Sequence, residues 1–123
     1  MLKSIMCVDD EAGMRKIVQT VLQTMGGFQV TPCDSGENAL IQVETALPDL
    51  ILLDVMMPGM DGIETLQAFK KSSAANIPVI FMTAKTEADE LEELLQTGAI
   101  GVIPKPFNPM TLVEKVNQIW ENQ

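Results

Sequence analysis

The stretch 50–62 constrains the fold more than any other part of the sequence. Four consecutive apolar residues, 50–53, run directly into Asp54, and the turn residues Pro48 and Pro58 lie on either side. An apolar run of this length between turn residues predicts a strand that is buried on both faces of a sheet. Asp54 would then lie at the carboxyl end of a central strand, where open α/β sheets bind their ligands. A carboxylate that only caps the next turn is the alternative for this residue taken alone.

Two other apolar runs also end in charged residues. A run near the amino end is followed by Asp9 and Asp10, and a run near the carboxyl end leads to Lys105. Because the carboxyl ends of parallel strands lie along one edge of a sheet, we expect the two aspartates to converge with Asp54. We expect Lys105 to lie nearby.

Three converging carboxylates need a cation or a proton to be tolerated. Two carboxylates about 4 Å apart repel by roughly 4 kcal/mol at an effective dielectric constant of about 20. Lys105 can offset only one of the charges, and a set of oxygen ligands favours a hard divalent ion such as Mg²⁺. The chain contains no histidine, which argues against a zinc or haem site.

The size and the charge of the chain limit its possible functions. We expect 123 residues to form a single domain, 1–123. A formal net charge of −9 argues against direct binding to nucleic acid, because that affinity depends on lysine and arginine side chains meeting phosphates.

The apolar runs and the cysteines indicate a cellular location. No run approaches the roughly 18 apolar residues of a membrane span. Asp9 and Asp10 interrupt the apolar start too early for a signal peptide. We therefore predict a cytoplasmic protein without membrane contact, in which Cys7 and Cys33 are free thiols rather than a disulfide.

Apolar periodicity predicts five strand–helix pairs. The predicted strands are 4–8, 28–31, the run that ends at Asp54, 77–82 and 100–103. The first helix ends at Gly26-Gly27, and the second is capped by Asp34 or Ser35 and has the apolar stripe Ala39, Leu40, Val43 and Leu47. The third helix opens with a capping box of Asp61 and Glu64, the fourth covers 87–97, and the last begins at Asn108 and Pro109.

This alternation of strands and helices predicts an α/β fold, in which a parallel sheet has helices on both faces. The short second strand, 28–31, is stopped by Pro32, and its polar Gln29 and Thr31 favour an edge position. We therefore expect a flavodoxin-like, doubly wound (βα)5 domain with a five-stranded parallel sheet of order 2-1-3-4-5. Its switch point between the first and third strands would carry the acidic residues.

Motifs of several other phosphate-binding and hydrolytic sites are absent. The sequence has no P-loop, no G-x-G-x-x-G, no G-x-S-x-G and no Cys–His pair. The polar residues that follow strands are Asp9, Asp10, Asp54, Thr83 and Lys105. Such a set suits phosphoryl transfer, since a carboxylate can attack phosphorus while a metal ion and a lysine neutralise the phosphoryl oxygens.

Four motifs together resemble the receiver domain of two-component response regulators. They are VDDE at 8–11, DVMMPGMDG at 54–62, TAK at 83–85 and KPF at 105–107. Their order and spacing make the resemblance specific, and it covers the whole chain. It implies a domain that takes part in phosphorelay signalling and catalyses only its own phosphorylation and dephosphorylation.

The resemblance also implies a role for each matched residue. Asp54 would accept a phosphoryl group from a phosphohistidine on a sensor histidine kinase or a histidine phosphotransfer protein. Thr83 would hydrogen-bond a phosphoryl oxygen, and Lys105 would pair with it. The Lys105-Pro106 bond would be cis, which an X–Pro bond permits at low cost.

The metal site implied by the resemblance is a Mg²⁺ site. Asp10 would bind the ion directly and Asp9 mainly through water. Asp54 and the backbone carbonyl of Met56 would supply further ligands.

One position departs from the family pattern. The family often has Tyr or Phe three residues before the lysine, and this chain has Val102 there. We therefore expect the effect of phosphorylation to pass through the loop 83–86 to the acidic fourth helix. A downstream protein would bind the face formed by the fourth helix, the fifth strand and the fifth helix.

The domain would be a monomer or weak dimer, either alone, like chemotaxis regulators, or as a piece of a larger regulator.

Two alternative functions stay open. A small Mg²⁺-dependent phosphatase that forms an aspartyl-phosphate usually has Asp-x-Asp at the nucleophile, whereas the residue two positions after Asp54 is Met56 here. A phosphorylation-independent interaction module would not need the acids, the threonine and the lysine that this chain retains.

Overall fold

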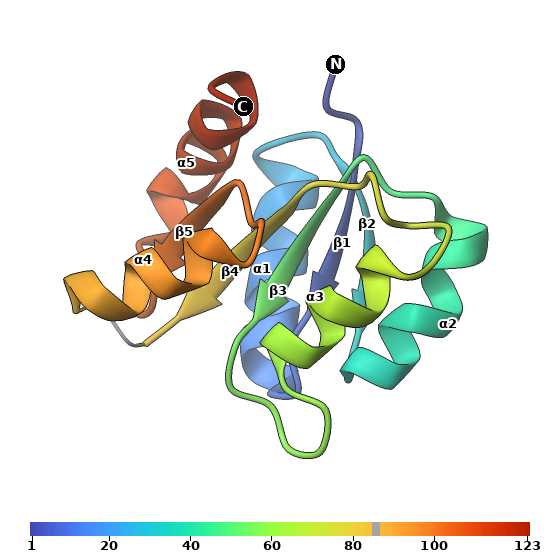
Figure 1. Cartoon of the computed structure of the whole chain (residues 1–123). Coiled ribbons are helices and arrows are strands. Elements are labelled where there is room, and N and C mark those ends of the chain that lie inside the picture. Colours follow the sequence, from blue (N-terminus) through green and yellow to red (C-terminus); the bar gives the residue numbers. More distant parts are fainter. Residues whose placement is uncertain (85–86) are drawn as a thin grey trace.

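Strands and helices alternate along the chain in the computed structural model, which describes residues 1–84 and 87–123 (Figure 1). The strands are β1 (Ser4–Val8), β2 (Gln29–Cys33), β3 (Leu50–Asp54), β4 (Val79–Thr83) and β5 (Gly101–Pro104). The helices are α1 (Ala12–Thr24), α2 (Gly36–Ala46), α3 (Gly62–Lys70), α4 (Ala88–Gln96) and α5 (Pro109–Glu121). Each predicted element is therefore present, with ends that differ from the prediction by a few residues at most.

The strands form one parallel sheet in the order β2-β1-β3-β4-β5, which confirms the predicted flavodoxin-like order. The register places Val8 beside Leu53 and Asp54 beside Met82. The carboxyl ends of β1, β3 and β4 are therefore level along one edge of the sheet.

Helices cover both faces of this sheet (Figure 1). α1 and α5 pack on one face, and α2, α3 and α4 pack on the other. Strand β3 is buried on both sides, because Leu50 and Leu52 join the apolar cluster under α1 and α5, while Ile51 and Leu53 join the cluster under the other three helices. None of the helices in the described part of the chain is long and apolar enough to cross a membrane.

Two details of the prediction were wrong. β2 continues through Pro32 instead of ending there, and a proline is tolerated because β2 is an edge strand. Leu47, which was expected on the buried stripe of the second helix, is 68% exposed. The helix ends one residue earlier than the apolar spacing indicates, so Leu47 is its C-cap and has a left-handed backbone with a φ of 45°.

Cys7 and Cys33 are both free, as predicted, and both are buried. They belong to the apolar clusters on opposite faces of the sheet, so their side chains point away from each other. Burial raises the pKa of Cys7 to about 12 and that of Cys33 to about 11. Both therefore remain protonated and unreactive at neutral pH.

Candidate functional site

Three acidic side chains meet where β1 and β3 end. Asp9 and Asp10 follow β1, and Asp54 is the last residue of β3. One carboxylate oxygen from each lies within 4.8 Å of the others. Asp9 and Asp54 are buried, with 3% and 6% of their surfaces exposed, whereas Asp10 is exposed. The strand order thus brings together the three acids that the sequence analysis expected at one edge.

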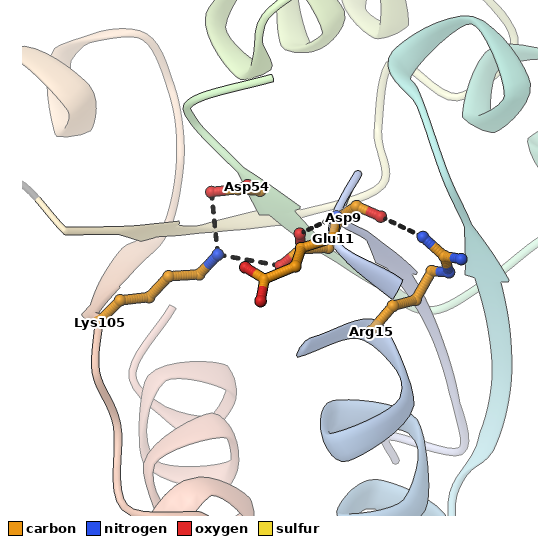
Figure 2. A network of polar contacts seen from close by, with 5 residues as sticks. All are labelled: Asp9, Glu11, Arg15, Asp54 and Lys105. Carbon is orange, nitrogen blue, oxygen red and sulfur yellow. Dashed lines mark hydrogen bonds and ion pairs between the residues drawn. The ribbon is translucent and has the colours of Figure 1, made fainter. Parts of the chain in front are cut away.

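Lys105 supplies a positive charge to these acids (Figure 2). Its Nζ lies 2.9 Å from Oδ2 of Asp9 and 3.2 Å from Oδ1 of Asp54, so the ammonium bridges two of the carboxylates. The lysine side chain is largely buried, with 15% of its surface exposed. The Lys105-Pro106 peptide bond is cis, as the resemblance implies.

Thr83 is the last residue of β4 and lies opposite Pro104 of β5. It is buried, with 1% of its surface exposed. Its carbonyl oxygen accepts a hydrogen bond from the N–H of Lys105 at 2.7 Å. The main chain therefore fixes the threonine and the lysine relative to each other. The threonine lies on β4, the strand next to the one that carries Asp54.

The loop between β3 and α3 starts and ends beside Asp54. The N–H of Gly62 donates to the carbonyl oxygen of Val55 at 2.9 Å, which closes the loop, and Asp61 caps α3 in the predicted capping box. Glycine is required at the closing position, since a Cβ on Gly62 would lie 2.3 Å from the carbonyl oxygen of Asp54. Met56 lies within this loop, and its side chain is 60% exposed.

Asp9 is held through both its backbone and its side chain (Figure 2). Its N–H donates to the carbonyl oxygen of Cys33 at 3.1 Å. Its Oδ1 accepts from the N–H of Glu11 at 2.9 Å. Its carbonyl oxygen accepts from Nη1 of Arg15 at 2.8 Å. Arg15 was not among the predicted site residues. The one indication in the sequence is that the only arginine of the chain lies one turn into the helix after the acidic pair.

The charges at this site shift two pKa values. Burial raises the pKa of Asp54, and the charges of Asp9 and Asp10 add to the shift, while Lys105 partly offsets it. Burial alone would lower the pKa of Lys105, but the hydrogen bond and charge of Asp9, together with Asp54, raise it above its usual range. The lysine is therefore protonated at neutral pH. Three carboxylates and one ammonium leave two negative charges in a set of oxygen donors, which a hard divalent cation could neutralise.

Comparison with known sequences identifies the family. The family model described as "Response regulator receiver domain" matches residues 5–117. The phosphate regulon transcriptional regulatory protein PhoB of Escherichia coli K12 is 38% identical over 120 residues, which are 97% of this chain and 52% of PhoB. The probable transcriptional regulator ycf27 of Guillardia theta is 37% identical over 117 residues, which are 95% of this chain and 45% of that protein.

Solved structures agree with this match. The chemotaxis response regulator CheY4 of Vibrio cholerae has a TM-score of 0.88 at 32% identity, with 97% of this chain and 99% of CheY4 covered. The receiver domain of the Francisella response regulator 1452 has a TM-score of 0.86 at 28% identity, with 98% of each chain covered.

A five-stranded parallel sheet with an acidic cluster and a lysine at its carboxyl edge is the architecture of a signalling receiver. The chain belongs to the response regulator receiver domain family of two-component systems, which confirms the resemblance seen in its motifs. It spans about half the length of the curated relatives it matches.

Proposed function

We propose that this domain accepts a phosphoryl group on Asp54 from a phosphohistidine of a sensor histidine kinase or a histidine phosphotransfer protein. One observation carries the proposal above all others. The Asp54 carboxylate lies at the end of the central strand, with two further carboxylates within 4.8 Å and Nζ of Lys105 at 3.2 Å. This arrangement combines an oxygen nucleophile with groups that can neutralise phosphoryl charge.

In the transfer step, an oxygen of Asp54 forms a bond to phosphorus as the phosphorus–nitrogen bond of the donor imidazole breaks. The imidazole nitrogen keeps the electron pair of the broken bond. Lys105 stays protonated and exchanges its contact with Asp54 for one with a phosphoryl oxygen, in agreement with its raised pKa. The hydroxyl of Thr83, which ends the neighbouring strand, donates a hydrogen bond to another phosphoryl oxygen.

The metal ion in this proposal is Mg²⁺. Its ligands would be Asp10 directly, Asp9 mainly through water, Asp54, and the backbone carbonyl of Met56. All of these are oxygen donors, which Mg²⁺ prefers, and the exposure of Asp10 leaves its carboxylate accessible to a hydrated ion. When bound, the ion supplies positive charge that offsets the charges of the acids and of the phosphoryl group.

The output of the domain is a change in protein binding. We expect it to catalyse only its own phosphorylation and dephosphorylation, and to present the face formed by α4, β5 and α5 to a downstream protein. Within α4, which is described throughout, only Leu94 is buried. A helix with so little buried surface can shift at low cost, which suits it to respond to phosphorylation.

The aliphatic side chain of Val102 favours one particular route by which the effect of phosphorylation reaches that face. It is partly buried against the apolar cluster that contains Phe81 and Leu94, and it has no ring that could rotate. The route in this proposal therefore runs from Thr83 through the following loop to the amino end of α4. Residues 85 and 86 of that loop lie outside the described residues.

A small phosphodonor separates this function from the alternatives. The chain is incubated with acetyl phosphate and Mg²⁺, and intact mass and phosphate release are followed together, with a metal chelator as control. A receiver gains one labile phosphoryl group per chain and releases phosphate slowly. A phosphatase would release phosphate over many turnovers, and an interaction module would show neither change.

A further inference from the structure

Arg15 is the only arginine in the chain, and its Nη1 donates to the backbone carbonyl oxygen of Asp9 at 2.8 Å (Figure 2). We infer that Arg15 is a positioning residue for the metal site, because it fixes the peptide unit between Asp9 and Asp10 and so directs the Asp10 carboxylate. The inference rests on the proposed function, in which Asp10 binds the metal ion directly.

The Asp9 carbonyl lies where regular structure gives it no partner. The N–H of Asp9 bonds to Cys33 of β2, but β1 ends at Val8 and α1 begins only at Ala12. A backbone carbonyl in a partly buried site that lacks a partner costs free energy. Arg15 supplies that partner from one turn inside α1, since side chains on a helix incline toward its amino end.

A fixed carbonyl at Asp9 has a direct effect on Asp10. The peptide unit is planar, so the direction of the Asp9 carbonyl determines where the N–H and Cα of Asp10 lie. The Asp9 side chain has other contacts, with the N–H of Glu11 and with Lys105. The Asp10 side chain is exposed and receives no hydrogen bond from any residue in the described part of the chain. Its placement therefore depends on the backbone around Asp9, which Arg15 holds together with the hydrogen bonds of Asp9 to Cys33 and Glu11.

A positioning role and a purely electrostatic role of Arg15 predict opposite changes in Mg²⁺ affinity when Arg15 is removed. The guanidinium is a positive charge beside an acidic cluster, so its removal alone would strengthen the attraction for Mg²⁺. If Arg15 holds Asp10 in place, its removal weakens Mg²⁺ binding. Lys16 provides a matched control, because it is the next residue, carries the same charge, is exposed and forms no hydrogen bond or ion pair with Asp9.

The test measures Mg²⁺ affinity by calorimetry in the wild type, Arg15→Gln, Arg15→Met and Lys16→Gln. Loss of groups that orient a metal ligand typically lowers affinity by roughly tenfold or more, so we expect both Arg15 variants to bind about tenfold more weakly. We expect Lys16→Gln to stay within about twofold of the wild type or to bind slightly more tightly. Arg15→Met keeps most of the aliphatic side chain and decides the question if Arg15→Gln does not fold.

A second readout needs no metal. In the metal-free protein, the amide resonance of Asp10 should shift in both Arg15 variants and stay in place in Lys16→Gln. Arg15 variants with wild-type or tighter Mg²⁺ affinity, or with an unmoved Asp10 amide, would overturn the inference. If the wild type itself binds no Mg²⁺, the proposed function fails, while the Asp10 amide still tests the positioning role.

Discussion

The fold holds Asp54 in surroundings that disfavour its ionised form. Burial and the neighbouring carboxylates raise its pKa, although Lys105 partly offsets them. A raised pKa in the folded state means that ionisation destabilises the fold, so the free energy of unfolding falls as the pH rises through the folded-state pKa. In the metal-free protein at neutral pH, the ionised Asp54 therefore lowers the free energy of unfolding. Asp54 is also the residue that the proposed reaction uses.

Asp54→Asn should relieve this cost. The amide keeps the shape of the side chain without the charge, so we expect the Tm of the metal-free protein at pH 7 to rise by about 2–5 °C, the size of shift that about 1 kcal/mol produces. The gain should shrink as the pH falls toward the usual range of aspartate pKa values. Thermal unfolding with a chelator at pH 7 and pH 4 measures both effects. Glu44→Gln, at an exposed position in α2, is the control, and an equal rise there would contradict the explanation.

At the scale of elements, local chemistry predicts some boundaries and tertiary structure decides others. Asp61 and Asn108 were both predicted as helix caps, because an N-cap side chain bonds the backbone within a few residues. Pro32 was taken as the end of a strand, yet it continues β2 because an edge position needs no N–H from it. Leu47 continues the apolar spacing of α2 although the helix has already ended. The spacing of apolar residues indicates which of them would share one face of a helix. It does not show where the helix ends or where the sheet stops covering that face.

The backbone of Leu47 offers a test of this boundary. Leu47→Gly should raise the free energy of unfolding by about 0.5–1 kcal/mol, because the left-handed conformation is unfavourable for a residue with a Cβ and the exposed side chain gives little in return. Leu47→Ala keeps the Cβ and should show no such gain. Urea denaturation of both variants decides this, and equal effects would mean that the backbone conformation is not the cause.

The close approach at the start of α3 is a second element-scale feature. Gly62→Ala should lower the free energy of unfolding by about 2 kcal/mol, because its Cβ would meet the backbone of Asp54 and Val55. Gly13→Ala is the matched control, since that Cβ meets nothing within 4 Å and a helical alanine should add about 0.5–1 kcal/mol. Chemical denaturation measures both changes, and a destabilised Gly13→Ala would argue against the steric explanation.

At the scale of the whole molecule, the strand order brings motifs that are distant in sequence together in one site. Asp9, Asp54 and Lys105 could be placed together from the sequence because each lies at the carboxyl end of a strand, and parallel strands end at one edge. Arg15 could not be placed, because its partner is a backbone carbonyl and such a contact leaves no pattern in the residue types. The sequence therefore predicts the charged groups of the site but not what holds them.

Metal binding should stabilise the whole domain. At a Mg²⁺ concentration about ten times the Kd, binding to the folded state alone adds about 1.4 kcal/mol to the free energy of unfolding, so the Tm should rise. The rise should diminish at lower pH, because the ligands must be ionised. Thermal unfolding across a Mg²⁺ titration measures it. Asp10→Ala is the control, and an equal rise in that variant would show that Asp10 is not a ligand.

The central claim is that this receiver takes a phosphoryl group on Asp54. The most direct measurement is the transfer of labelled phosphate from a phosphorylated histidine kinase, in Mg²⁺, to the wild type and to Asp54→Asn. The wild type should gain one acid-stable, base-labile phosphoryl group, and the variant should gain none while remaining folded by circular dichroism. Labelled phosphate on Asp54→Asn, at any residue, would contradict the account.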